Sequence, residues 1–248
     1  MLFNFSNPWM IGLLIILIFE NLQGYINNPN ALLGLLLSIP GLLIAITFHE
    51  FAHAFVADKL GDDTPRRQGR LTLNPLAHFD PFGTLLMLFA GFGWGKPVQI
   101  NPNNFNRKVT IRKGNALVSL AGPIMNFILA IIFSIIYGLL IAFTDIFLTE
   151  AGDIIGIIIT SIITMNVGLG VFNLIPLPPL DGSKVLSALL PTNARTWFIN
   201  HQQILYIIFL VIWLTPIASM IISPIIGFIN EKLLYLIVLI AKMGAWQN

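Results

Sequence analysis

The stretch AITFHEFAHAFVAD, residues 45 to 58, carries two histidines and a glutamate within five positions of an otherwise apolar segment. On a helix, His49 and His53 lie one turn apart on the same face, so both imidazoles can reach one ion while Glu50 projects beside them. Polar groups of this kind are costly at lipid depth and usually mark a functional site. The alternative, a structural network of buried histidines, is weaker because three such groups in one turn would be costly without a ligand.

The composition indicates that this segment belongs to a membrane protein. Hydrophobic residues make up 56% of the 248 residues and charged residues only 10%, whereas soluble domains have about 25% charged residues. The chain has no cysteine, which excludes disulfides and thiol catalysis, so a metal would be held by His, Asp or Glu. The net charge of +2 gives no sign of a nucleic-acid partner.

We expect an all-α polytopic membrane protein with five or six transmembrane helices, because a spanning helix needs about 20 mostly apolar residues. The candidate spans are 8–19, 31–57 with a kink at Pro40, 115–143, 154–175, and 204–229 with interruptions at Pro216 and Pro224. Residues 233–241 are too few to span alone and are either an interfacial helix or the end of a span that begins near Pro224. The division of the chain that follows is 1–30 for the first span and an external linker, 31–190 for the core, and 191–248 for the C-terminal helices.

The region between the second and third spans is expected to be membrane-associated. Residues 79–95 (FDPFGTLLMLFAGFGWG) are too few and too rich in Gly to cross a bilayer, which favours a re-entrant or interfacial piece. Residues 96–114 (KPVQINPNNFNRKVTIRKG) alternate β-forming and polar residues around NPNN, a pattern that predicts a β-hairpin. The alternative is a solvated loop.

The distribution of basic residues predicts the orientation. Nine of the 13 Lys and Arg residues fall between Lys59 and Lys113, and the positive-inside rule places such a loop in the cytosol. We therefore expect the loop 58–114 to be cytosolic. The HEFAH motif then lies near the cytosolic end of its helix.

A third ligand is expected, since catalytic zinc usually has three protein ligands and one open position. Asp58 is nine residues after His49, about 180° around the helix and on the wrong face. Residues 172–186 (FNLIPLPPLDGSKVL) contain three prolines that end the fourth span, and Asp181 lies at this break, on the same side as HEFAH. An ordinary capping Asp is the alternative. A His, His, carboxylate set also suits Fe(II), but Glu50, placed for proton transfer, favours zinc hydrolysis.

Four motifs together resemble the site-2 protease family of intramembrane zinc metalloproteases, in its compact form without a PDZ domain. They are HEFAH, GDDTPRRQGRLTLNPLAHFDPFGT, SLAGPIMNFILA and NLIPLPPLDGSKVL, and they cover residues 44–186. The resemblance implies that His49, His53 and Asp181 bind one Zn²⁺ per chain and that Glu50 is the catalytic base. It also implies a multi-pass protein of the cell membrane that cleaves transmembrane protein substrates near the cytosolic face, in regulated intramembrane proteolysis.

Two asparagines are candidate substrate-binding residues. Asn126 lies four residues after Gly122, hence on the same helix face, and the resemblance places a polar residue here at the active-site cleft. Its alternative role is to join neighbouring helices. Asn173 precedes the proline break and is expected to orient Asp181 or to hold an unwound substrate, with capping of free carbonyls as an equal alternative.

Two other functions remain open from the residues alone. A membrane metal-ion transporter would use His and Asp as a transit site without a special need for Glu50. An inactive membrane scaffold of the same fold would lack the metal, although the intact HEFAH and LDG motifs argue against it. A homo-oligomer is also left open.

Overall fold

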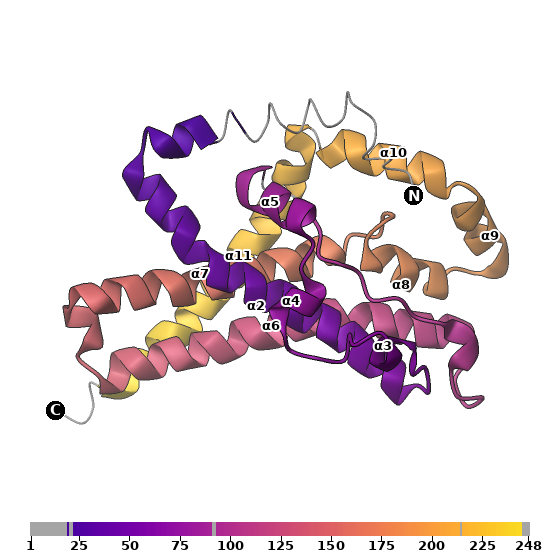
Figure 1. Ribbon diagram of the computed structural model, residues 1–248, viewed down its shortest axis with the longest axis horizontal. Helices are drawn as coiled ribbons and strands as arrows, with labels where there is room; N and C mark the ends of the chain where they lie inside the picture. Colours follow the sequence, from indigo (N-terminus) through magenta and orange to yellow (C-terminus); the bar gives the residue numbers. More distant parts are fainter. Residues whose placement is uncertain (1–18, 20–21, 91–92, 214, 245–248) are drawn as a thin grey trace.

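The structure is a computed structural model that describes residues 19, 22–90, 93–213 and 215–244. All regular secondary structure among these residues is helical, which confirms the expected all-α class. The first expected span, 8–19, lies outside the described residues except for its last residue. Figure 1 shows the long helices side by side, with the shorter elements gathered at one end and along one face of them.

Four of the described helices are long and apolar enough to cross a membrane. They are α2 (Pro29–Lys59), α6 (Ile111–Phe143), α7 (Glu150–Asn173) and α11 (Pro216–Gly244). A fifth span is present if α9 (Thr192–Asn200) and α10 (Gln202–Trp213), which meet at 68°, are counted as one. The chain is therefore a multi-pass membrane protein by its helices.

The C-terminal helices differ in their limits from the expected 204–229 and 233–241. Helix α10 ends at Trp213, and α11 starts at Pro216 and continues without interruption to Gly244. The physical reason is that proline lacks an N–H and has a fixed φ, so it ends the preceding helix and suits the first turn of the next.

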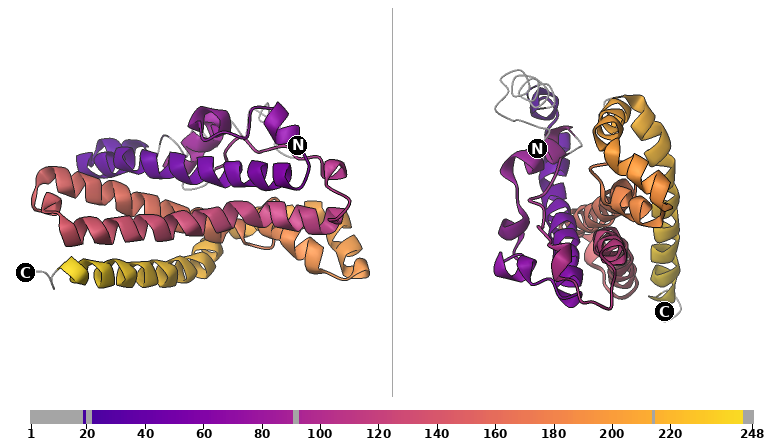
Figure 2. Two further views of the ribbon diagram at one scale, coloured as in Figure 1. Left: turned by 90° about the horizontal axis from the view of Figure 1, so that it is seen from below. Right: turned by 90° about the vertical axis from the view of Figure 1, so that its right-hand side faces the viewer.

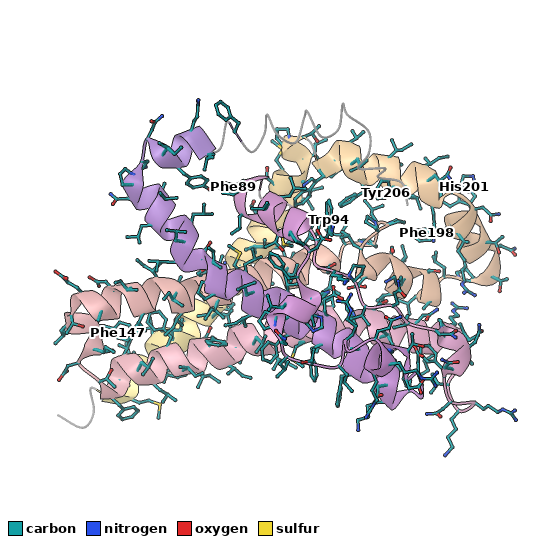
Figure 3. The ribbon with its side chains drawn as sticks, in the orientation of Figure 1. Phe89, Trp94, Phe147, Phe198, His201 and Tyr206 are labelled. Carbon is teal, nitrogen blue, oxygen red and sulfur yellow. The ribbon has the colours of Figure 1, made fainter. Side chains whose placement is uncertain are left out.

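The long helices form three layers (Figure 2). Helices α6 and α7 form the middle layer, α2 lies on one side of it, and α11 lies on the other side. One apolar core joins α6, α7 and α11, and its buried residues are Ala130, Ile159, Ile163, Val167, Val171, Leu233 and Ile237. Gly41 of α2 allows close approach to α7, since a Cβ there would lie 2.9 Å from the backbone of Ser161 and Ile162. At the turn between α6 and α7, in η2 (Ile146–Leu148), Phe147 lies at the end of these helices remote from α8 (Asp181–Leu189; Figure 3).

The predicted β-hairpin at 96–114 is wrong. No strand is present among the described residues, and this segment instead contains η1 (Pro102–Asn104) and the first turn of α6, where the Thr110 side chain accepts the Lys113 N–H. Residues 79–95 contain a short helix, α5 (Pro81–Ala90). At ten residues it is too short to span a bilayer.

The side chain of Asp62 replaces the expected strand partner. Its carboxylate, fully buried, accepts hydrogen bonds from the Asn101 N–H at 2.6 Å and from the Asn104 side chain at 2.9 Å. It also accepts the N–H and hydroxyl of Thr64, which begins α3 (Thr64–Arg67). Burial raises the pKa of Asp62, but these hydrogen bonds outweigh burial and hold its pKa below the ordinary value. The loop is thus held by hydrogen bonds to one carboxylate rather than by the backbone hydrogen bonds of paired strands.

The substitution Asp62→Asn should destabilise the protein in a pH-dependent way. At pH about 7 the free energy of unfolding should fall by about 1–3 kcal/mol, because the amide cannot accept from all four donors. Since the folded pKa is depressed, this stabilisation is present above an unfolded pKa of about 3.9 and is lost as the pH falls through the folded value. Thermal unfolding of the two proteins in detergent, followed from pH 7 downwards, measures the difference.

Asp63→Asn is the matched control, because the Asp63 side chain is 46% exposed and its ion pair is a surface pair with Arg67. Its effect should stay below about 1 kcal/mol. Equal losses for Asp62→Asn and Asp63→Asn, or a loss for Asp62→Asn that does not shrink in acid, would contradict this account of the loop.

Candidate metal centre

The two histidines of the HEFAH motif face one point inside the helix bundle. His49 and His53 lie one turn apart on α2, with both side chains buried. Their rings meet edge to face with centroids 4.6 Å apart, and their Nε2 atoms are 3.0 Å apart. This arrangement is the one expected from the spacing of the motif.

Asp181 reaches the same point from the break after α7. Helix α7 ends at Asn173, the chain continues through the proline-rich segment 174–180, and α8 begins at Asp181. Gly182 permits this return, because a Cβ there would lie 2.3 Å from the carbonyl oxygen of Leu174. The Asp181 Oδ2 atom lies 3.2 Å from His49 Nε2 and 3.0 Å from His53 Nε2.

The three atoms form a triangle that fits a tetrahedral metal ion. Its sides are 3.0, 3.0 and 3.2 Å. Bonds of about 2.0–2.1 Å to zinc would separate tetrahedral ligands by about 3.3 Å, which is close to the observed values. His49, His53 and Asp181 are also the one group of this kind among the described residues.

Hydrogen bonds behind the histidines fix which ring nitrogen carries the proton. His53 Nδ1 lies 2.7 Å from the Val118 carbonyl oxygen, and a carbonyl can only accept. His53 Nδ1 therefore holds its proton, and the lone pair of Nε2 points into the triangle.

The same assignment for His49 follows from a chain of two asparagines. The Asn166 amide group donates to the Ile162 carbonyl at 2.8 Å, so its oxygen faces Asn126 and accepts the Asn126 amide at 2.8 Å. Asn126 also donates to the Ala45 carbonyl at 3.0 Å. The Asn126 oxygen is thereby turned toward His49 Nδ1, 2.7 Å away, and the His49 Nδ1 proton is donated to it.

With both imidazoles neutral, the outcome is a cluster of acceptors with no donor among them. Two imidazole lone pairs and a carboxylate oxygen lie within 3.2 Å of one another. A cation at the centre satisfies all three, and neutral imidazole and carboxylate are ligands that zinc accepts. The donor set present in the chain thus fits a zinc ion.

One face of α6 backs this site. Val118, Gly122 and Asn126 recur every four residues, and Gly122 lies directly behind the imidazoles. A Cβ at Gly122 would lie 2.6 Å from both His49 Cε1 and His53 Nε2. Any larger residue there would displace the rings, so the glycine is required by the site itself.

Glu50 lies beside the histidines but outside the triangle. Its carboxylate is half-buried and accepts the Val98 N–H at 3.0 Å, from the segment that follows α5. This contact places a loop residue next to Glu50. The proton-accepting role of Glu50 stays a prediction.

The two predicted substrate-binding asparagines are placed differently. Asn126 is fully buried, and its side chain is already hydrogen-bonded to His49, Ala45 and Asn166. Asn173 is half-buried, and its amide donates to the Leu169 carbonyl one turn earlier at 3.1 Å. Their binding of substrate stays a prediction.

Two residues near the site were not singled out from the sequence. Asn166 lies in the apolar span ITMNVGL, and its polarity at mid-span was the available signal. Lys184 places Nζ 3.4 Å from Asp181 Oδ1, the carboxylate oxygen that faces away from the histidines. Its place one turn after Asp181 was visible in the sequence, but the contact depends on the position of α8.

Comparisons with known proteins agree with this centre. Residues 141–216 match the model of peptidase family M50. YwhC of Bacillus subtilis, named as a candidate zinc metalloprotease, is 40% identical over 195 residues, which cover 79% of this chain and 88% of YwhC. Two proteins called Rip2 are also named as candidate zinc metalloproteases.

The Rip2 protein of Mycolicibacterium smegmatis is 32% identical over 187 residues, covering 73% of this chain and 68% of Rip2. The Rip2 protein of Mycobacterium tuberculosis H37Rv is 30% identical over 199 residues, which cover 79% of this chain and 73% of that protein. No solved structure matches the chain. The identity to YwhC over most of both proteins, together with the His, His, Asp centre, shows that the chain belongs to peptidase family M50 and is a membrane zinc metalloprotease.

Proposed function

We propose that the protein is an intramembrane zinc endopeptidase that hydrolyses peptide bonds within transmembrane segments of other membrane proteins. The observation that carries this proposal is the acceptor-only cluster of His49, His53 and Asp181, buried between apolar helices. His49 lies about 15 Å from the Lys59 end of α2, at 1.5 Å per residue. A bond that reaches this depth belongs to a substrate segment within the membrane.

One zinc ion per chain would be held by His49 Nε2, His53 Nε2 and Asp181 Oδ2. When bound, zinc supplies a Lewis acid that lowers the pKa of water to about 7 and polarises a carbonyl. Val118 and Asn126 keep both imidazoles in the tautomer that presents Nε2, and Lys184 lies against the second oxygen of Asp181. These contacts orient the donors before a substrate arrives.

Glu50 supplies the proton transfers. Its carboxylate follows His49 directly on α2, is not part of the triangle, and is held by the Val98 N–H. It accepts the proton of the attacking water and then gives a proton to the leaving amine, the two transfers that peptide hydrolysis requires. An unwound peptide is the form that can react, because the carbonyls of a helix are hydrogen-bonded internally.

The orientation that follows from the basic residues places this chemistry near the cytosolic face of the cell membrane. The loop 58–114 carries nine of 13 Lys and Arg residues. In this Cys-free chain, Asn103→Cys should react with an impermeant thiol reagent only after the membrane is opened. Labelling of the introduced thiol at this exposed position in intact cells would overturn the orientation.

Glu50→Gln should separate metal binding from hydrolysis. The amide keeps the size of the side chain but cannot accept the proton, so zinc should stay bound while cleavage of a reconstituted transmembrane substrate falls about 10²-fold or more. His49→Ala should lose both. Elemental analysis and product quantification on the same samples measure the two effects.

Asp63→Asn, a surface change on the same side of the molecule, is the control for handling and reconstitution. Near-native cleavage by Glu50→Gln would refute the proposed role of Glu50. Transport of Zn²⁺ across vesicles without any cleavage would instead favour a metal-ion transporter.

Asn166→Leu should weaken zinc binding although Asn166 does not reach the ion. The leucine removes the acceptor that orients the Asn126 amide, so His49 loses the contact that fixes its tautomer, and zinc affinity should fall about 10-fold or more. Competition with a chelator series measures it. Thr164→Val, an exposed polar residue on the same helix, should leave the affinity unchanged, and equal affinity in the two variants would exclude the asparagine chain from metal binding.

A further inference from the structure

A pair of opposite charges lies in the middle of α11. Glu231 and Lys232 follow 15 residues of the helix and precede 12 more. Their side chains are 73% and 60% exposed, and their nearest charged atoms are 3.7 Å apart. Among the described residues, each is the other's only ion-pair partner.

Packing shows that these charges lie at mid-depth in the bundle. Leu233, the next residue, is buried in one core with Ala130, Ile159 and Ile163. Ile159 and Ile163 lie on either side of the midpoint of α7, and Ala130 is close to the midpoint of α6. Figure 2 shows α11 as an outer layer running along these two helices.

Exposed charges at this depth require a partner. Ionisable side chains within membrane spans nearly always face protein or a water-filled cavity, because hydrocarbon cannot solvate them. Glu231 and Lys232 instead line a depression on the outer surface of α11, with Leu234, Tyr235 and Val238. This face is therefore poorly suited to lipid and suited to protein.

The pattern of the exposed face is that of a helix–helix seam. Ile221, Phe228, Tyr235 and Leu239 are exposed and recur at spacings of seven and four residues, so they form one line along the helix. At about 100° per residue, Glu231 and Lys232 flank this line, each about 50° to one side. The buried residues Leu233 and Ile237 lie on the opposite face.

We propose that this face of α11 binds α11 of a second copy of the chain, with the two helices parallel around a two-fold axis along the membrane normal. The axis gives both copies the same orientation, as shared topology requires. It places Glu231 of each copy opposite Lys232 of the other, on both sides of the seam, because the charges flank its centre symmetrically. The surface is self-complementary, which favours a second copy over an unrelated helix.

A cross-linking experiment on the full-length chain in native membranes tests the contact. Tyr235→Cys introduces a single thiol on the line of the seam, and mild oxidation should give a covalent dimer. Ile132→Cys is the matched control, since this residue is also exposed and lies near the same depth on α6. Cross-linking no greater than that of the control, or cross-linking of the introduced thiol to a different protein, would overturn the proposal.

Charge reversal tests the pairing itself. In the Tyr235→Cys background, Glu231→Lys and Lys232→Glu should each lower dimer formation by about tenfold or more, because like charges then face one another. The two variants expressed together, with different tags, should form the mixed dimer, and the double reversal in one chain should restore the homodimer. Undiminished dimers in the single variants, or no recovery in the mixed and doubly reversed proteins, would refute the charge pairing.

Discussion

The hydrogen bonds from the two imidazole Nδ1 atoms are the interaction on which the centre depends. His53 donates to the Val118 carbonyl and His49 to the Asn126 oxygen. Each bond assigns the proton to the outer nitrogen, and each leaves Nε2 as a bare acceptor. Since Asp181 adds a carboxylate oxygen to the same point, the cluster is incomplete without a cation. The proposed metal binding thus depends on the groups behind the three candidate ligands as much as on the ligands themselves.

The helices that hold these groups are determined by the same centre. Val118, Gly122 and Asn126 must face α2 along one side of α6, and Gly122 must lack a side chain for α2 to approach. Asn166 must face Asn126 from α7. Because these contacts join α6 to α2 and α7 to α6, small rotations of α6 or α7 would break the hydrogen-bond chain. The bundle and the metal centre therefore constrain each other.

The parts of the site that are local in the sequence could be predicted from it. The spacing of His49 and His53 determines their common face on a helix, and the prolines before Asp181 determine the break after α7. The asparagine chain could not be derived in this way, because Asn166 and Asn126 are 40 residues apart and their pairing depends on helix rotation. The prediction of a β-hairpin was wrong for a related reason. The alternation in 96–114 suggested that this segment pairs with a neighbouring strand, whereas the Asn101 N–H and the Asn104 side chain donate to the Asp62 carboxylate.

A single rule, that polar groups within a membrane must be paired, accounts for two distant regions of the molecule. At the candidate metal centre, the amide group of each asparagine in the chain donates to an acceptor, and the three remaining acceptors face the point where a cation fits. On α11, Glu231 and Lys232 form an ion pair with each other at 3.7 Å, on the outside of the bundle, and among the described residues neither has another ion-pair partner. The first region is completed by an ion and the second by another helix. Since the charges on α11 lie on the face opposite its contact with α6 and α7, that helix can join two copies while both metal centres stay within their own bundles.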